Sequence, residues 1–418
     1  MTDSHIMDNE YVENARWSAI TAVKQAPDAK FLLFTGDFVE TGTEQNSEWE
    51  WEQWFEVSMK PLLSRMALAP TDGNHDDTPN LNYTYHFNTD KTFNETATVK
   101  PQFDGITYSF VYGDALFMVY SHQDFWRGSY SYANGTSTYL SNDVANWFRD
   151  QVEKYPDTKW RIAAVHKNLF TGSGHQTDED GALFRATLLP VFQELNIDFV
   201  IQGHHIYEVM GPINNTTKTI VPGSVTNVEL VSPDSNKNPK GQQGGTFNVK
   251  DGTLYFVNGT CGRKRYYPYT QDEMEAGFDK HKVEGYWDLF TGKYGQPGAP
   301  AFSEISVSSS EIEVNTYTSD ANAQATLFDT FKIVKSGNTG IEENKQSAKL
   351  YPTYAKDKIN TTESDIIQVN AIDLTGKIYT LPFDNQHIDV SNLTDGIYVV
   401  QIFTNEKTRS ERIVKTSR

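Results

Sequence analysis

The 418-residue sequence is poor in cysteine, in basic residues and in long apolar runs. Its single cysteine, Cys261, excludes an internal disulfide and a metal cluster held by several thiolates. The 36 lysines and arginines face 55 aspartates and glutamates, and the resulting net charge of −19 disfavours binding to nucleic acid or to an anionic membrane surface. No apolar run approaches the roughly 18 residues that a membrane-spanning helix needs, so we expect no membrane span.

The composition nevertheless indicates a folded chain with more than one domain. Hydrophobic residues make up 38% and aromatic residues 13% of the sequence, which is more than a disordered chain carries. A length of 418 residues exceeds one typical domain, so two domains are the first expectation. The opening stretch MTDSHIMDNE has neither the basic nor the apolar region of a signal peptide.

Residues 1–335 alternate between helices and strands in a way that indicates an α/β domain. Helices are predicted over 9–26, 48–64, 142–154 and 180–195, and apolar strands over 31–34, 66–70, 161–165 and 199–201. A polar cluster follows each of these strands, at the position where open α/β sheets bind ligands. Gly113-Asp114 marks a hairpin, and short β-rich runs dominate from about residue 217 onward.

The C-terminal part of the sequence has a different character. The polar stretch 336–349 is predicted to be a linker. Residues 350–418 contain short apolar runs separated by turn pairs such as Asp395-Gly396. This spacing predicts a small all-β sandwich that forms a second domain.

Side chains suited to metal binding are concentrated at the predicted strand ends. In chain order they are Asp3-Ser4-His5, Gly36-Asp37, Gly73-Asn74-His75-Asp76, His166 and Gly203-His204-His205. Carboxylate, imidazole and amide oxygen together suit divalent zinc, manganese or iron. Turn chemistry or a hydrogen-bonded core histidine would explain each cluster alone. Their joint occurrence at successive strand ends points instead to two ions about 3.5–4 Å apart, an arrangement that can clamp a displacement at phosphorus.

In their order and spacing these clusters resemble the calcineurin-like metallophosphoesterases, including the purple acid phosphatase branch. The resemblance covers residues 1–335 and implies a four-layer α/β/β/α sandwich. The ligands that it implies are, for one divalent ion, Asp3, His5 and His205, for the second ion, Asn74, His166 and His204, and, bridging both, Asp37. A hydroxide held between the ions would be the nucleophile, because coordination can lower the pKa of water from about 15.7 toward about 7.

The same resemblance implies roles outside the ligand set. His75 matches the family's catalytic histidine, and we place Asp76 beside it in the catalytic motif. His175 lies nine residues after His166, where purple acid phosphatases carry histidines that contact phosphate. Arg263, in a run of basic residues, is a second candidate for holding substrate phosphate, and a structural charge cluster is the alternative. The implied substrate is a small phosphate ester, in particular a monoester.

Three features depart from the family pattern. Glu40 stands where purple acid phosphatases have a tyrosine three residues after the bridging aspartate, so no iron–tyrosinate colour is expected. The motif Gly203-His204-His205 is one residue shorter than the family's Gly-His-x-His. Both histidines can bind only if this loop is contorted, because neighbouring side chains of an extended chain point apart. Asp3 lacks the strand that should precede it, so we expect the natural chain to begin further upstream, with that strand and a signal peptide.

The C-terminal part carries a resemblance of its own. Leu350-Tyr351-Pro352, the run 369–377, the segment 392–398 and the closing 412–415 look like a type IX secretion sorting domain. The resemblance implies export by the secretion machinery and a secreted or cell-surface location. An accessory β-sandwich without a sorting role is the alternative. For the whole protein, the alternative to phosphate ester hydrolysis is a non-catalytic surface or adhesion protein that retains the fold.

Overall fold

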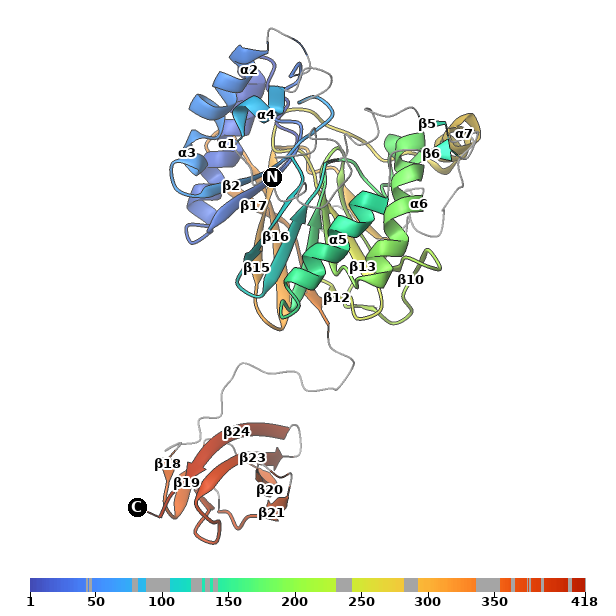
Figure 1. Ribbon diagram of the computed structural model, residues 1–418. Coiled ribbons are helices and arrows are strands. Elements are labelled where there is room, and N and C mark those ends of the chain that lie inside the picture. The colour runs from blue at the N-terminus through green and yellow to red at the C-terminus, as the bar shows by residue number, and fades with distance from the viewer. Residues whose placement is uncertain are drawn as a thin grey trace. The chain divides into compact units, whose positions relative to one another are not determined.

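Figure 1 presents the computed structural model of the chain, which describes residues 1–42, 44, 47–76, 82–87, 106–121, 130–131, 136–137, 142–230, 243–281, 292–335, 354–361, 365–373, 375, 377–384, 387–404 and 408–417. The chain divides into two compact units, Met1–Gly337 and Asn338–Arg418. The predicted linker 336–349 and the motif Leu350-Tyr351-Pro352 lie outside the described residues. In the described part of the chain, no helix has the length and apolar character needed to cross a membrane.

The helices of the first unit are α1 (Asn9–Gln25), α2 (Glu48–Gln53), α3 (Lys60–Leu63), α4 (Asn82–His86), α5 (Asn142–Lys154), α6 (Glu179–Glu194) and α7 (Gln271–His281), with a π-helical segment η1 (Trp54–Ser58) and a 3-10 turn η5 (Gly174–Thr177). Helix α1 begins as predicted because the side chain of Asp8 accepts hydrogen bonds from the first backbone N–H groups. The single helix predicted over 48–64 is wrong: it is divided into α2, η1 and α3, and Pro61 in the first turn of α3 has no N–H to continue the preceding helix. Helix α7 lies in a region that was predicted to be rich in strands.

Strands of the first unit form two large sheets and a separate parallel pair, β1 with β2. The larger sheet has the order β10-β9-β13-β8-β7-β4-β3, with β14 paired to β9, and the smaller has the order β11-β12-β17-β16-β15. Strands β5 and β6 form a short hairpin. The bounds are β1 (Phe31–Thr35), β2 (Ala67–Thr71), β3 (Tyr108–Tyr112), β4 (Ala115–Val119), β5 (Tyr130–Ser131), β6 (Thr136–Ser137), β7 (Trp160–Ala164), β8 (Phe199–Gln202), β9 (Tyr207–Asn214), β10 (Thr219–Ile220), β11 (Val225–Thr226), β12 (Thr246–Asn248), β13 (Thr253–Asn258), β14 (Gly292–Gly295), β15 (Ala301–Val307), β16 (Glu311–Ser319) and β17 (Ala325–Val334).

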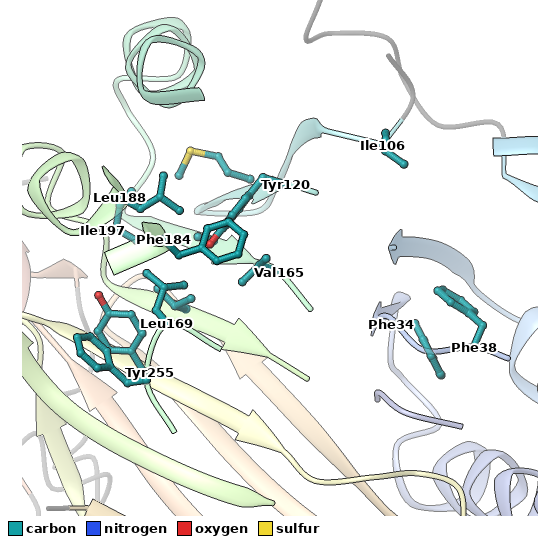
Figure 2. Packing of buried hydrophobic residues seen from close by; sticks show 14 of the residues in the cluster. Phe34, Phe38, Ile106, Tyr120, Val165, Leu169, Phe184, Leu188, Ile197 and Tyr255 are labelled. Carbon is teal, nitrogen blue, oxygen red and sulfur yellow. The ribbon is translucent and has the colours of Figure 1, made fainter. Parts of the chain in front are cut away.

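The two large sheets pack face to face and are covered by helices. Trp160 of the larger sheet and Phe331 of the smaller belong to one buried cluster between them. Helices α5 and α6 cover the other face of the larger sheet (Figure 1), where Tyr120, Phe184 and Leu188 pack together (Figure 2). Helix α1 contacts β15 and β16 of the smaller sheet. The predicted four-layer α/β/β/α arrangement is therefore confirmed.

The second unit is built from strands in its described residues. One sheet has the order β18 (Tyr354–Ala355), β24 (Thr408–Lys415), β23 (Gly396–Thr404), β20 (Ile366–Asp373) and β21 (Ile378–Thr380), and β19 (Lys358–Asn360) pairs with β22 (His387–Asp389). Val369, Ile388 and Ile402 from both sheets share a buried core. This is the small all-β sandwich that the sequence predicts.

A cavity of about 410 Å³ lies beside β1 in the first unit. Phe31, Leu33, Phe256 and Phe302 contribute to its lining, which is mainly apolar. The predicted metal ligands are not among the residues that line it, so this cavity is separate from the candidate site described next.

Candidate metal centre

The N-terminal residues lie beside β1 and carry two of the predicted ligands to its carboxyl end. The backbone N–H of Asp3 donates to the carbonyl of Gly36 at 3.0 Å, and that of His5 donates to the carbonyl of Asp37 at 3.1 Å. On the other side, the N–H of Gly262 donates to the carbonyl of Asp3 at 3.3 Å. Asp3 and His5 are therefore held between β1 and the segment that follows β13.

Side-chain nitrogens converge on the carboxylate of Asp37. Its Oδ2 lies 3.1 Å from His166 Nε2, 3.3 Å from His5 Nε2 and 3.9 Å from His204 Nδ1. All four residues are buried. Asp37 thus occupies the central position that a bridging ligand requires.

Three predicted ligands of one ion come together on one side of Asp37. The ring nitrogen His166 Nε2 lies 3.2 Å from Asn74 Oδ1 and 2.9 Å from His204 Nδ1. These atoms come from three separate strand ends, and the parallel pairing of β7 and β8 brings His166 and His204 to the same edge of the sheet.

The other predicted set is assembled in part. His5 Nε2 lies 3.4 Å from Asp3 Oδ1, and the His5 ring centroid lies 4.8 Å from that of His75. The nitrogens of His205 group instead with those of His175 and His204. The structure therefore brings Asp3 and His5 to Asp37 as expected but places His205 toward His175.

Several of the predicted ligands have a left-handed backbone. The φ angle is 55° for Asp3, 47° for His5, 54° for Asp37 and 73° for His204. Residues other than glycine adopt this region rarely, at a cost of about 1–3 kcal/mol each, and such strain gathers at functional sites. At His204 it turns the chain so that its ring centroid lies 5.2 Å from that of His205. The contortion that the shortened histidine motif requires is present.

Two motif glycines allow the loops to approach this closely. A Cβ atom at Gly36 would lie 2.6 Å from His166 Nδ1, and one at Gly203 would overlap Thr2 Oγ1. The N–H of His204 then donates to Asp3 Oδ2 at 2.8 Å. Glycine at these positions lets the loops after β1 and β8 and the N-terminal residues meet at one point.

Burial and mutual charge set the pKa values of the centre. Burial lowers the pKa of His5 and of His166, but the Asp37 carboxylate together with Asp3 and the other hydrogen-bond partners outweighs it and raises each to about 9. Burial would raise the pKa of Asp37, yet the two imidazoles hold it well below its usual range. Burial, together with neighbouring imidazoles, lowers the pKa of His204 and of His205 well below the usual value. The centre therefore favours positive charge, carried either by protons on the imidazoles or by bound cations that displace them.

The donor atoms of the centre fit divalent ions. Among the described residues, the buried atoms without a hydrogen-bond partner include Asp3 Oδ1, Asp37 Oδ2, His204 Nε2 and both ring nitrogens of His205. Buried polar atoms are normally satisfied by a partner. Carboxylate oxygens and imidazole nitrogens with available lone pairs are the donor set of zinc, manganese and iron, so the residues fit the two ions that the sequence implies.

Asp76 ties the ligand loops together through both of its carboxylate oxygens. Its Oδ2 accepts hydrogen bonds from the N–H groups of Asp37 at 2.8 Å and Gly73 at 2.7 Å, and its Oδ1 accepts one from Phe38 at 2.8 Å. This arrangement differs from the predicted catalytic role. Because both oxygens bind the backbone, Asp76 positions Asp37.

His75 lies at the edge of the centre with a partly exposed side chain. Its Nδ1 lies 2.7 Å from the carbonyl oxygen of Glu40, and an Nδ1–H donated to this carbonyl leaves Nε2 to act on a bound substrate. The Glu40 side chain places Oε2 2.6 Å from His5 Nδ1. Glu40 therefore orients the His5 ring so that Nε2 faces Asp37.

The two residues predicted to bind substrate lie in different places. The ring centroid of His175 is 4.2 Å from that of His204, and its Nδ1 is 2.5 Å from Asp178 Oδ2. His175 therefore borders the centre. Arg263 instead places Nε 2.6 Å from Glu10 Oε1 on α1, which agrees with the alternative of a structural charge cluster.

Lys264 and Tyr266 also border the centre but were not among the predicted site residues. Lys264 Nζ lies 3.7 Å from Glu40 Oε2, and the hydroxyl of Tyr266 lies 3.3 Å from His5 Nε2. Both residues follow β13. They are distant in sequence from the N-terminal ligands and lie near them only in the folded chain. The basic run around Arg263 was the signal in the sequence that pointed to this segment.

Comparisons with known proteins match two families to different parts of the chain. Residues 1–207 match the calcineurin-like phosphoesterase model, and residues 349–416 match the secretion system C-terminal sorting domain. No curated protein matches the sequence.

Three solved structures are similar to this chain at low sequence identity, and the first of them shares its fold. A purple acid phosphatase from yellow lupin (Lupinus luteus) seeds is 14% identical, with a TM-score of 0.50 over 80% of this chain and 53% of that chain. This chain therefore spans about half the length of the lupin enzyme. The GAP50 anchor of the inner membrane complex of Plasmodium is 12% identical, with a TM-score of 0.47 over 81% of this chain and 88% of that chain. A structure described as a 5'-nucleotidase from Staphylococcus aureus is 15% identical, with a TM-score of 0.34 over 83% of this chain and 56% of that chain.

The two matched segments do not overlap, and each lies within its own compact unit. The ligand clusters that end with His204 and His205 fall within the first match. Residues 1–207 of the chain belong to the calcineurin-like phosphoesterase family, and residues 349–416 belong to the secretion system C-terminal sorting domain family.

Proposed function

We propose that the chain is a metal-dependent phosphoesterase that hydrolyses small phosphate esters, in particular monoesters, outside the cell. The observation that supports this most strongly is the convergence of His5, His166 and His204 on the Asp37 carboxylate. The left-handed backbone at Asp37 and His204 is further support for the proposal, because the fold maintains backbone strain at the residues that carry the donor atoms.

The donors divide between two divalent ions. Asn74, His166 and His204 would hold one, Asp3 and His5 would hold the other, and Asp37 lies between the two sets of side chains. The ring of His205 lies 4.8 Å from that of Tyr266 and its nitrogens group with those of His175 and His204, so His205 borders the centre without joining the second set. When bound, two such ions act as Lewis acids on a phosphate ester and on water.

The chain's own residues supply the remaining chemistry. With Nδ1 held by the Glu40 carbonyl, a protonated His75 delivers its Nε2 proton to the oxygen of the departing alcohol. His175, oriented through Nδ1 by Asp178, turns its ring toward the phosphate beside His204. Lys264 adds positive charge at the opposite side, next to Glu40.

The sorting domain supports export by a type IX secretion machinery and a secreted or cell-surface location. In a host that has this machinery, deletion of residues 349–416 is expected to keep the protein inside the cell, as fractionation and immunoblotting would reveal. Export of the shortened chain at the normal level would contradict this part of the proposal.

The catalytic proposal is tested with an activated monoester and an activated diester, p-nitrophenyl phosphate and bis-p-nitrophenyl phosphate, and with metal analysis of the same samples. The wild type is expected to contain metal and to prefer the monoester. His75→Ala should keep its metal, and its turnover of an alkyl phosphate, which has a poor leaving group, should fall by about 10²-fold or more, whereas p-nitrophenyl phosphate, whose leaving group needs little protonation, should be slowed less. Arg263→Ala is the control, because Arg263 pairs with Glu10, and it should leave turnover unchanged. A metal-loaded wild type that hydrolyses neither ester would favour the non-catalytic alternative.

A further inference from the structure

The segment from Gly262 to Thr270 passes along one side of the metal centre in a fixed path. The guanidinium of Arg265 donates to Thr260 Oγ1 at 2.9 Å and to the carbonyl of Gly262 at 2.7 Å. The side chain of Gln296 donates to the carbonyl of Tyr266 at 2.5 Å. These bonds hold the segment in place, and it lies outside the part of the chain that matches the phosphoesterase family.

The N-terminal part of this segment lies beside His5, the predicted ligand next to Asp37. The hydroxyl of Tyr266 lies 3.3 Å from His5 Nε2, and Lys264 Nζ lies 5.6 Å from the Tyr266 ring centroid. Arg263 and Arg265 are bound to Glu10 and to the segment itself, so Lys264 is the basic side chain of this run that is directed to the centre.

The other end borders His175. The N–H of Tyr269 donates to the carbonyl of Gly172 at 2.9 Å. The Tyr269 hydroxyl packs so closely on Gly174 that a Cβ atom there would lie 2.7 Å from it. Gly174 directly precedes His175, so Tyr269 lies at the far edge of the centre from Tyr266.

Aromatic surface remains open to solvent along this path. Tyr269 is 38% exposed and Tyr267 is 67% exposed, whereas Tyr266 is partly buried and contacts His5 and His205. We call Tyr266, Tyr267 and Tyr269 the tyrosine wall. Rigid tyrosine rings beside a site offer a large contact surface at little cost in conformational entropy.

We propose that the tyrosine wall binds the alcohol part of the substrate, and that the substrates are phosphate monoesters whose alcohol carries a planar aromatic ring, as in a nucleoside monophosphate. This inference rests on the proposed phosphoesterase function. With the phosphate at the metal centre near Lys264, the ring of the alcohol would stack on Tyr269, and Tyr267 would extend the surface.

Two substrates with the same phosphorylated carbon isolate the ring. Adenosine 5'-monophosphate and ribose 5-phosphate have closely similar leaving groups and differ in the base. We expect kcat/KM of the metal-loaded full chain to be about tenfold or more higher for adenosine 5'-monophosphate, mainly through KM. Tyr269→Ala should remove most of that preference by raising KM for the nucleotide, with kcat and the ribose 5-phosphate constants unchanged.

Two further variants separate stacking from a structural effect. Tyr269→Phe keeps the ring and should keep the preference. Tyr112→Ala removes a tyrosine that is 49% exposed on β3, away from the wall, and should behave as wild type. Equal kcat/KM of the wild type for both substrates, or an equal loss for both in Tyr269→Ala, would overturn the inference while the proposed function stands.

Binding affinity tests the tyrosine wall even without turnover. Calorimetric titration of the metal-loaded chain should give a Kd about tenfold lower for adenosine 5'-monophosphate than for ribose 5-phosphate, and Tyr269→Ala should abolish the difference. If binding discriminates but neither ester nor p-nitrophenyl phosphate is hydrolysed, the proposed function fails and the wall stands as a binding site. Equal Kd values would overturn the inference in either case.

Discussion

The Asp37 carboxylate lies within 4 Å of ring nitrogens of His5, His166 and His204. Its backbone is left-handed, and its N–H is bound by Asp76. A side chain fixed in this way between two donor sets serves both of them, so its removal should affect both ions and not only one.

Asp37→Asn is expected to lose most of its bound metal, because the amide removes the negative charge that favours cations in the centre. Elemental analysis of the purified protein after dialysis should fall from two ions per chain to fewer than one. Asp28→Asn, at an exposed position, is the matched control and should retain the wild-type content. A full complement of metal in Asp37→Asn would refute the bridging role.

Glu208 on β9 should make stability depend on pH. Its side chain is buried, its Oε1 accepts a hydrogen bond from the N–H of Gly172 at 2.5 Å, and burial raises its pKa to about 8. Since the folded state holds this proton up to about pH 8 while the unfolded state releases it near pH 4.5, the contribution of Glu208 to stability is fully present below pH 4.5. It falls by roughly 1.4 kcal/mol per pH unit as the pH rises to about 8.

Glu208→Gln removes this dependence. Urea unfolding at pH 5 and pH 8 should therefore give a variant whose free energy of unfolding, relative to wild type, is clearly more favourable at pH 8. Glu52→Gln, an exposed control, should change neither value. A constant difference between Glu208→Gln and wild type at both pH values would show that Glu208 is ionised in the folded state.

The sequence predicts which residues are metal ligands, but it does not predict the role of every other residue near the centre. Asp37, Asn74 and His166 follow apolar strands directly, so their place at the sheet edge can be inferred from pattern alone. The role of Asp76 depends on the backbone N–H groups around it, and the pairing of Arg263 with Glu10 depends on where β13 ends. Neither carries a periodic signal in the sequence.

Among the elements, the loops that end the strands determine how closely the ligands approach. Gly203 precedes the histidine pair after β8, and a Cβ atom there would meet Thr2 Oγ1, the carbonyl of Thr35 and Asp3 Oδ2. A larger side chain at Gly203 would therefore force this loop away from the N-terminal residues and separate His204 from Asp3.

Gly203→Ala should destabilise the protein by about 2–3 kcal/mol and lower its metal affinity, because backbone and ligand atoms must move to relieve the overlap. Gly113→Ala is a useful comparison. Gly113 has a φ of 57° but nothing within 4 Å of its Cβ position, so the change should cost only about 1–2 kcal/mol and leave metal binding intact. Thermal unfolding with and without added zinc measures both effects, and equal metal affinity in the two variants would argue against the packing account.

Elements with strong periodicity were predictable and those set by tertiary contacts were not. The 142–154 helix and the strand at 199–201 carry clear patterns, and both are present as α5 and β8. The break in the 48–64 helix arises where the N–H of Met59 bonds to the carbonyl of Trp54, five residues back. That choice depends on how Trp54 packs beneath Phe34 and Phe38, which local sequence does not specify.

On the scale of the whole molecule, the two units have separate cores. Ile162 of β7 belongs to the core between the sheets of the first unit, and Ile402 of β23 belongs to the core of the second. We therefore expect the units to unfold in two transitions by calorimetry. Ile162→Ala should lower the free energy of unfolding of the first unit and Ile402→Ala that of the second, each by about 2–5 kcal/mol, because each change creates a cavity. A single transition that both variants lower equally would contradict this independence.

The net negative charge of the chain belongs almost entirely to the first unit, which also contains the centre that favours cations. This distribution suits divalent ions and small phosphate esters held by those ions, and it disfavours long polyanions.

We propose above all that the centre around Asp37 binds two divalent ions and uses them on phosphate esters. Metal analysis of the full-length wild-type protein, combined with p-nitrophenyl phosphate turnover before and after chelation, tests it most directly. We expect two ions per chain, loss of turnover on chelation, and recovery of turnover when zinc, manganese or iron is restored. A chain that binds one ion or none, or whose turnover survives complete removal of metal, would contradict it.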